Sequence, residues 1–329
     1  MKYVTIPRTD LRVSTICLGS GEVGSSLDQE KSFRLLDAML EFGGNFLDTA
    51  HDYGNWVKGL ELSACEKTIG RWMKTRGSRQ KFVLATKGGD EFLEGPYVPR
   101  VNQKDVLTDL EESLRFLQTD VIDLYYLHRD DPAQPVGELL EFLNDQVHAG
   151  KIRYYACSNW KTSRMAAAKA YAAEHGLHGF VADESFWNAG VRAKPPYGVS
   201  RLGWMNQERY LFHLTSGMAM IPYQSQAFGL YQFMANGTLD QMNPDFRSFY
   251  KIPESQQRFE RMCRLMDEMH LTITQIILGY LLSQPFLTIP IVGCQTPAQV
   301  RDSFSAADVH LSLEQLRFIE TGEEPYNIS

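Results

Sequence analysis

Residues 121–128 read Val121-Ile122-Asp123-Leu124-Tyr125-Tyr126-Leu127-His128, an apolar run rich in aliphatic and aromatic side chains that ends at a histidine. A short run of this composition favours a buried β-strand. Stretches with apolar residues at helical spacing lie on both sides of it, at Gln103–Leu117 and Val136–Ala149. This order of helix, strand and helix predicts one unit of an α/β fold with a parallel sheet.

The same alternation continues along the chain of 329 residues. Eight strands are predicted, at Thr15–Leu18, Asn45–Leu47, Phe82–Thr86, Val121–Leu127, Ile152–Cys157, Phe180–Ala182, Met218–Tyr223 and Leu287–Val292. Further helical patterns lie at Gln29–Phe42, Glu66–Thr75 and Arg164–His175. Eight such units predict a closed (β/α)8 barrel (a TIM barrel), with residues 1–329 as a single domain and long loops on the face where the strands end.

An open doubly wound sheet is the alternative architecture. Gly19, Gly21 and Gly24 have the Gly-x-Gly-x-x-Gly spacing of a dinucleotide-binding turn. The chain after them leads to Asp48 and Tyr53, however, and not to an acidic residue placed to bind a ribose. The barrel is therefore the favoured prediction.

The composition is that of a globular protein, with 43% hydrophobic and 22% charged residues. A net charge of −7 argues against nucleic acid or an anionic membrane as a partner. No apolar run is long enough to span a bilayer, the first residues lack the apolar core of a signal peptide, and the five cysteines have no metal-binding spacing. We therefore expect a cytoplasmic protein with reduced cysteines and no metal site.

Polar residues with catalytic potential follow consecutive predicted strands. Asp48 follows the second strand, with Tyr53 in the loop beyond it, and Lys87 and His128 follow the third and fourth strands. The strands of a barrel end on one rim, so these four side chains are expected to converge. A nearby ammonium favours the phenolate and is expected to lower the pKa of Tyr53. Neutral His128 can donate a hydrogen bond that polarises a carbonyl, so the set suits proton transfer to a developing alkoxide.

At these residues the chain resembles the aldo-keto reductase family. The resemblance is carried by the segments Asn45–Ala50 with Tyr53-Gly54, Ala85–Gly89, Asp123–His128 and Cys157–Trp160. It implies an oxidoreductase that uses NADP(H), with NAD(H) as the alternative, to reduce a small-molecule carbonyl or oxidise an alcohol. It also implies that Tyr53 is the general acid/base, that Lys87 and Asp48 tune it, and that His128 orients the substrate.

The resemblance further implies which residues bind the cofactor. Ser158 and Asn159 would hold the carboxamide, Tyr223 would stack on the nicotinamide, and the stretch after Tyr223 would line the pyrophosphate. The remaining predicted cofactor contacts are Gly21, Glu22, Gln224, Ser225, Gln226, Gly229, Gly293, Gln295, Gln299 and Ser303.

Two features depart from the family pattern. Glu184 stands where the family usually has a glutamine on the carboxamide, and an ionised carboxylate there would favour the oxidised, cationic cofactor. Members that prefer NADP(H) usually present basic residues after the eighth strand. Here Arg301 is the only cation between Gly293 and Ser303, which leaves NAD(H) as a serious alternative.

Substrate contacts are expected on the same rim, from Trp56, Arg129, Trp160 and Trp187. His51 and Asp52, by contrast, are interpreted as solvated loop residues. Long rim loops at Asn188–Tyr210 and Phe233–Pro253 suggest a roomy pocket suited to a keto sugar as well as to an aldehyde or ketone.

Two other functions are weighed against the oxidoreductase. Lys87 could serve as the nucleophile of a Schiff-base aldolase, although this leaves Tyr53, Ser158 and Asn159 unexplained. The chain could also be a non-catalytic, cofactor-binding regulatory subunit, against which the intact set of four rim residues argues.

Overall fold

The computed structural model describes residues 1–90, 98–194 and 202–323. Eight parallel strands form its centre, hydrogen-bonded in the order β10-β3-β4-β5-β6-β7-β8-β9. They are β3 (Cys17–Gly19), β4 (Phe46–Asp48), β5 (Val83–Gly88), β6 (Ile122–Leu127), β7 (Ile152–Ser158), β8 (Ala182–Phe186), β9 (Ala219–Tyr223) and β10 (Ile291–Gly293). A bridge between Met220 and Thr288 closes the ring. The predicted (β/α)8 barrel is confirmed.

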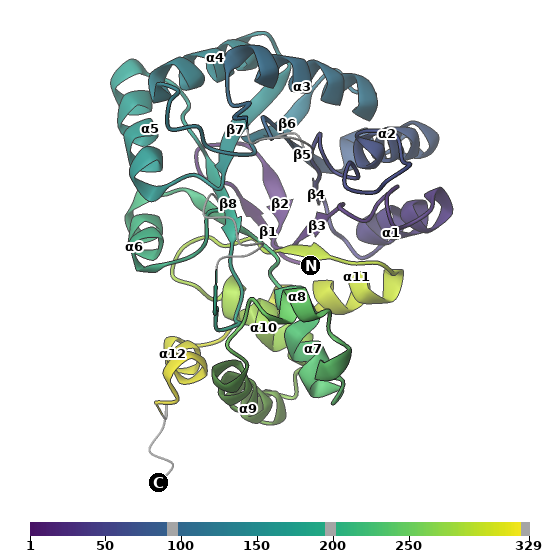
Figure 1. Ribbon diagram of the computed structural model, residues 1–329, viewed down its shortest axis with the longest axis vertical. Coiled ribbons are helices and arrows are strands. Elements are labelled where there is room, and N and C mark those ends of the chain that lie inside the picture. Colours follow the sequence, from purple (N-terminus) through teal and green to yellow (C-terminus); the bar gives the residue numbers. More distant parts are fainter. Residues whose placement is uncertain (91–97, 195–201, 324–329) are drawn as a thin grey trace.

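Helices connect the strands and surround the ring (Figure 1). They are α1 (Gln29–Glu41), α2 (Ala64–Arg76), α3 (Gln103–Leu117), α4 (Val136–His148), α5 (Thr162–His175), α6 (Gln207–Ser216), α7 (Leu230–Ala235), α8 (Pro244–Arg247), α9 (Ile252–Met269), α10 (Ile273–Leu282), α11 (Pro297–Phe304) and α12 (Leu313–Thr321). Short 3-10 turns lie at η1 (Arg79–Lys81), η3 (Ala227–Gly229), η4 (Leu239–Gln241) and η5 (Ser305–Asp308).

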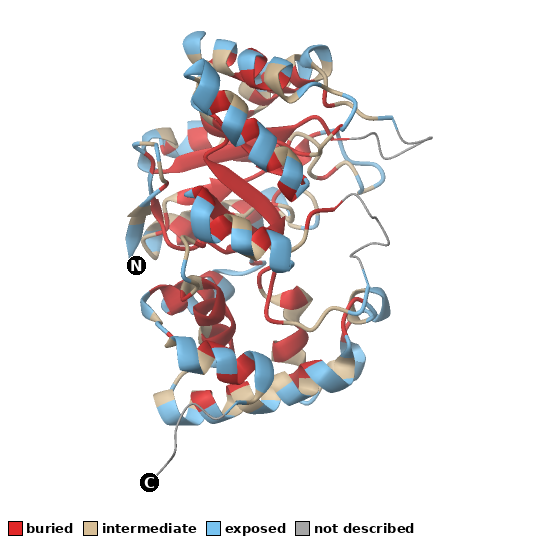
Figure 2. Cartoon of the chain, turned by 90° about the vertical axis from the view of Figure 1, so that its left-hand side faces the viewer, coloured by how far each residue is buried: buried red, intermediate tan, exposed pale blue. Residues whose placement is uncertain are grey.

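Alternation along the strands divides the core into two clusters. In β6, Leu124 and Tyr126 belong to the cluster inside the barrel, whereas Tyr125 and Leu127 belong to the cluster between the strands and the helices. This is why the strand is apolar on both faces and reads as a continuous hydrophobic run. The strands and the inward helix faces are accordingly buried in Figure 2.

An N-terminal hairpin was not predicted from the sequence. Strand β1 (Tyr3–Thr5) pairs antiparallel with β2 (Arg12–Ser14). Its side chains Ile6, Leu11 and Val13 join the inner cluster, at the end of the barrel where the strands begin. The hairpin therefore covers the face opposite the rim.

The prediction of a second long rim loop at Phe233–Pro253 is wrong in part. It contains η4 and α8, and α9 begins within it. Asn243 caps α8 by accepting from the Asp245 amide, and proline stands in the first turn, where it favours a helix start. The first predicted loop, Asn188–Tyr210, ends in the first turn of α6, and its residues 195–201 lie outside the described residues.

Across the described ranges, none of the helices is both long and apolar enough to cross a lipid bilayer.

Candidate active site

Three consecutive strands bring the predicted catalytic side chains to one rim. Asp48 is the last residue of β4, Lys87 lies one residue before the end of β5, and His128 directly follows β6. The ladder continues past the strand ends, since the His128 amide donates to the carbonyl oxygen of Gly88 at 2.9 Å. Hydrogen bonding between neighbouring strands therefore fixes the relative positions of these residues.

Lys87 lies at the centre of the site and has no exposed surface. Its Nζ donates to Asp48 Oδ1 at 2.5 Å, to the carbonyl oxygen of Thr49 at 2.9 Å and to Tyr53 Oη at 3.3 Å. Glu184 Oε1 is a fourth oxygen neighbour, at 3.4 Å. Burial disfavours the charged amine, but the charges of Asp48 and Glu184 outweigh it and raise the pKa of Lys87 well above its usual value.

Tyr53 keeps its proton more firmly than the sequence predicted. Burial raises the pKa of the Tyr53 phenol well above 10, and the Lys87 charge only partly opposes this. The Lys87 charge lowers the pKa of the phenol as expected, but desolvation, which the sequence argument left out, outweighs it and makes the net shift upward. A phenol is ordinarily a stronger acid than an alcohol, which suits Tyr53 to protonating an alkoxide. Its ring packs edge-on against Trp56 and His128, with centroids 5.6 and 6.0 Å away.

Glu184 faces the same site from β8, where it pairs with Ser158 of β7. The side chain is buried, and its Oε2 has no hydrogen-bond partner within the described part of the chain. Burial and the neighbouring Asp48 charge raise the pKa of Glu184 well above its usual value. Both effects favour the protonated carboxyl, in the direction opposite to the negative charge expected from the sequence.

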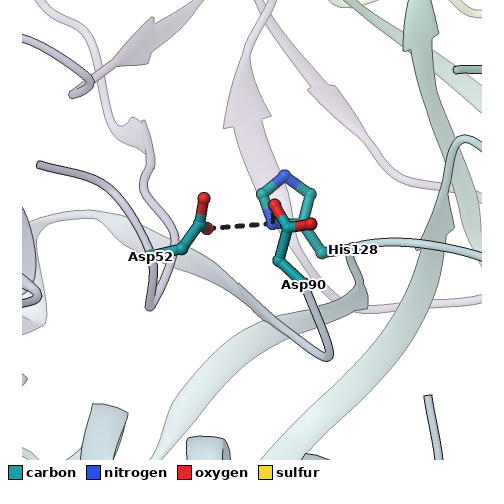
Figure 3. Close-up of side chains that lie close together, drawn as sticks. All are labelled: Asp52, Asp90 and His128. Atoms are coloured by element: carbon teal, nitrogen blue, oxygen red, sulfur yellow. Dashed lines mark ion pairs between the residues drawn. The ribbon is translucent and has the colours of Figure 1, made fainter. Parts of the chain in front are cut away.

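His128 has an unexpected acidic environment (Figure 3). Its Nδ1 lies 3.0 Å from Asp52 Oδ1 and 3.2 Å from Asp90 Oδ2, and the Nε of Arg129 lies 2.9 Å from Asp90 Oδ1. Burial outweighs the Asp90 charge and lowers the pKa of His128 to about 3, so the ring is neutral. Asp52 had been interpreted as a solvated loop residue, and Asp90 was missed. Its position three residues after Lys87 was the available signal.

Asn159 links the histidine to the expected nicotinamide pocket. It has a left-handed backbone with φ of 62°, and its Nδ2 donates to the His128 carbonyl oxygen at 3.3 Å and to Ser158 Oγ at 3.0 Å. Its Oδ1 accepts from Tyr223 Oη at 2.9 Å and from the Gly203 amide at 3.0 Å. Three of the predicted cofactor residues, Ser158, Asn159 and Tyr223, thus form one hydrogen-bonded cluster.

A buried ionic network that the sequence did not reveal supports this cluster. Asp183 Oδ2 accepts from Arg209 Nη1 at 2.5 Å and lies 3.0 Å from the Nε2 of His213. Arg209 also donates to Ser185 Oγ and to the Trp160 carbonyl oxygen. The pKa of Asp183 is held at about 2, because Arg209 and the His213 hydrogen bond outweigh its burial. The network ties α6 to β8 and to the backbone of Trp160, the residue after Asn159.

The predicted pyrophosphate residues are held together by hydrogen bonds. Ser225 Oγ donates to the Ile291 carbonyl oxygen at 2.5 Å, and Gln226 Nε2 donates to Ser303 Oγ at 3.2 Å. These bonds tie the loop after β9 to β10 and α11, which are the two regions expected to share the cofactor.

Other predicted cofactor residues leave open surface for a ligand. A Cβ added at Gly21 or Gly293 would meet no atom within 4 Å. Gln224 and Gly229 have positive φ values of 52° and 81°. The Glu22 carboxylate accepts from Ser26. The open glycine surfaces and the unpartnered Glu184 oxygen fit an extended ligand that presents an amide group.

The predicted adenosine end is poor in positive charge. The Gln295 amide donates to Gln299 Oε1 at 2.7 Å. The guanidinium of Arg301 lies 5.1 Å from the centre of the Phe42 ring.

The predicted substrate contacts divide into two pairs. Trp56 is half-exposed beside Tyr53, and Arg129 pairs with Asp90 near His128, so both lie at the rim. Trp160 is fully buried, and its Nε1 donates to the Arg129 carbonyl oxygen at 2.9 Å. Trp187 is almost as buried and packs against other aromatic rings. Trp160 has no exposed surface and Trp187 has 8%, so both indoles belong mainly to the hydrophobic core.

Comparison with known proteins agrees with this arrangement. Residues 15–323 match the model of the Aldo/keto reductase family. An uncharacterized oxidoreductase of Bacillus subtilis, YrpG, is 31% identical over 97% of this chain and 95% of its own length.

Fungal enzymes are also similar to the chain over most of their length. A norsolorinic acid reductase of Emericella nidulans is 29% identical, over 96% of this chain and 80% of the relative. An aryl-alcohol dehydrogenase [NADP(+)] of Phanerodontia chrysosporium is 27% identical, over 95% of this chain and 83% of the relative.

Proposed function

Because the chain belongs to the aldo/keto reductase family, we propose that it is a nicotinamide-dependent carbonyl oxidoreductase in which Tyr53 is the general acid/base. The observation that carries the proposal is the position of Tyr53 Oη, 3.3 Å from the Nζ of a buried lysine that Asp48 holds at 2.5 Å. A phenol beside a fixed ammonium suits proton transfer to an alkoxide.

The proposed chemistry moves a hydride and a proton onto a carbonyl. When bound, a reduced nicotinamide would supply the hydride that the carbonyl carbon takes up. Tyr53 gives its Oη proton to the carbonyl oxygen, which becomes the alcohol. Lys87 stabilises the phenolate left behind, and Asp48 holds Lys87 in place. In the oxidation direction Tyr53 takes the proton back from the alcohol.

His128 is proposed to orient the carbonyl oxygen. Its ring is neutral, so it can donate one hydrogen bond without adding a positive charge beside Lys87. Trp56 and Arg129 are proposed to border the substrate, which we infer to be an aldehyde, a ketone or a keto sugar.

We favour NADP(H) as the cofactor, on the family relationship and on the relative whose name includes NADP(+). Ser158, Asn159 and Glu184 would hold the carboxamide. Titration of the purified chain with NADPH and with NADH compares the two affinities directly.

A Schiff-base aldolase is not favoured. Lys87 is bound to Asp48 and has its pKa raised, so it lacks the free electron pair that attack on a carbonyl needs. Borohydride should therefore trap no substrate on Lys87.

Turnover of a carbonyl panel tests the proposed function. The chain and NADPH are incubated with aromatic aldehydes, aliphatic aldehydes and keto sugars. We expect oxidation of NADPH in a one-to-one ratio with alcohol formed. Tight NADPH binding without turnover of any carbonyl, in either direction, would favour the regulatory subunit instead.

A further inference from the structure

Three side chains from three different rim loops converge beside the catalytic centre. Asp52 lies in the loop after β4, Asp90 follows β5, and His128 follows β6. One donor atom from each lies within 4.8 Å of the others. Figure 3 shows both carboxylates turned toward the imidazole. No ligand spacing was visible in the sequence, because each loop contributes one residue.

The contact is not a hydrogen-bonded histidine–aspartate pair. His128 is only 6% exposed, and its Nδ1 makes no hydrogen bond in the described residues, although oxygens of Asp52 and Asp90 lie 3.0 and 3.2 Å away. Asp52 Oδ1 is likewise buried without a hydrogen bond among those residues. A buried nitrogen this close to two carboxylates costs free energy unless something else satisfies it.

The two distances from His128 Nδ1 to the carboxylate oxygens match the spacing of neighbouring ligands around one metal ion. An ion about 2.1 Å from each ligand holds two cis ligands roughly 3.0 Å apart in an octahedron and roughly 3.4 Å apart in a tetrahedron. The observed distances of 3.0 and 3.2 Å from His128 Nδ1 fall within this range. When an ion lies on the axis of the Nδ1 lone pair, the neighbouring carboxylate ligands lie off that axis. Their oxygens can therefore be close to Nδ1 without standing where a hydrogen bond to Nδ1 would form.

We propose that Asp52, Asp90 and His128 form a site for a divalent first-row transition metal of the zinc or manganese class. One imidazole and two carboxylates suit such ions better than magnesium or calcium, which prefer oxygen ligands alone. The two carboxylates balance the charge of the ion. Arg129 holds the other oxygen of Asp90 at 2.9 Å and so fixes its orientation.

The site has a consequence that rests on the proposed function. A metal on Nδ1 leaves the imidazole proton on Nε2. That is the tautomer in which Nε2 can donate to a carbonyl oxygen. The bound ion is therefore a device that fixes the tautomer of His128.

Direct binding of metal tests the inference. The metal-free chain is titrated calorimetrically with Zn²⁺ and Mn²⁺, with Mg²⁺ as the comparison ion. We expect one Zn²⁺ or Mn²⁺ per chain. Affinity should fall at least about tenfold in Asp52→Asn and in Asp90→Asn. Glu112→Gln is the matched control, because Glu112 also lies 2.9 Å from a histidine nitrogen, that of His51, and should leave affinity unchanged.

A second readout covers variants that fold poorly. Co²⁺ added to the intact chain should give a visible absorption spectrum that Zn²⁺ abolishes by displacement. Tyr53→Phe should bind metal like the parent chain, which separates failure of this site from failure of the proposed function. The inference is overturned if no transition metal binds at millimolar concentration, or if the bound ion is unaffected by both aspartate variants.

Discussion

Glu184 Oε1 lies 3.4 Å from the Nζ of Lys87, so the chain places a second carboxyl group beside the lysine that Asp48 already pairs. All three side chains are buried. Two buried carboxylates and one ammonium would leave a net negative charge. The raised pKa of Glu184 acts against this net charge, because it favours the protonated carboxyl.

Glu184→Gln should therefore change little in how the chain discriminates between the oxidised and the reduced cofactor. A protonated carboxyl and an amide are both neutral, so the ratio of affinities for oxidised and reduced cofactor should stay within about twofold at neutral pH, or ~0.4 kcal/mol. Fluorescence titration of both cofactor forms measures the ratio. A ratio shifted strongly toward the reduced cofactor would mean that Glu184 is ionised.

Removal of Lys87 should destabilise the fold as well as abolish turnover. Lys87→Met leaves Asp48 buried without its partner, and the loss of unfolding free energy is expected to be about 3 kcal/mol. The double variant Lys87→Met with Asp48→Asn should regain most of that stability but no activity. Urea unfolding and turnover separate the two effects. Recovery of activity in the double variant would contradict the role of Lys87.

The titration of the buried Glu66 carboxyl should be visible in the pH dependence of the free energy of unfolding. Burial raises the pKa of Glu66 to about 7, and its Oε1 accepts from Thr86 at 2.6 Å. The folded state therefore holds this proton more tightly than the unfolded state. Stability contributed by Glu66 falls as pH rises from about 4.5 to 7 and is constant above that.

Glu66→Gln should accordingly stabilise the chain at pH values above about 7, by roughly 1–3 kcal/mol, and flatten this part of the profile. Glutamine keeps the acceptor for Thr86. Glu41→Gln, on the exposed end of α1, is the control and should change neither stability nor slope. An unchanged slope in Glu66→Gln would show that another group titrates in this range.

A basic residue at position 295 should strengthen NADP(H) binding. Gln295 is exposed at the predicted adenosine end, and a guanidinium there could pair with the 2′-phosphate. Gln295→Arg is expected to raise NADPH affinity about tenfold, or ~1.4 kcal/mol, and to leave NADH affinity within twofold. Gln80→Arg adds the same charge beside the start of β5 and should affect neither. Equal gains in affinity for NADPH and for NADH would mean that the 2′-phosphate does not bind near residue 295.

The sequence predicted the barrel because strand and helix periodicities are local properties. A strand was predicted at or beside each of the eight, but the bounds shifted: β8 (Ala182–Phe186) shares only Ala182 with the predicted strand Phe180–Ala182. The N-terminal hairpin was missed, because its strands are three residues long and are stabilised by packing across the barrel floor.

The positions of Asp48, Lys87 and His128 at strand ends were predictable for the same reason. Their protonation was not. The pKa of Tyr53 depends on burial, and that of Glu184 on burial and on Asp48, which no spacing in the sequence reveals. Trp160 shows the same limit, since an aromatic residue after a strand can point into the pocket or into the core.

The most direct test of the account is the turnover of Tyr53→Phe. This variant removes one oxygen and keeps the ring that packs against Trp56 and His128. We predict that its kcat falls roughly a hundred- to ten-thousand-fold while NADPH binds with unchanged affinity. Turnover within a few-fold of the parent chain would contradict the assignment of Tyr53 as the general acid/base.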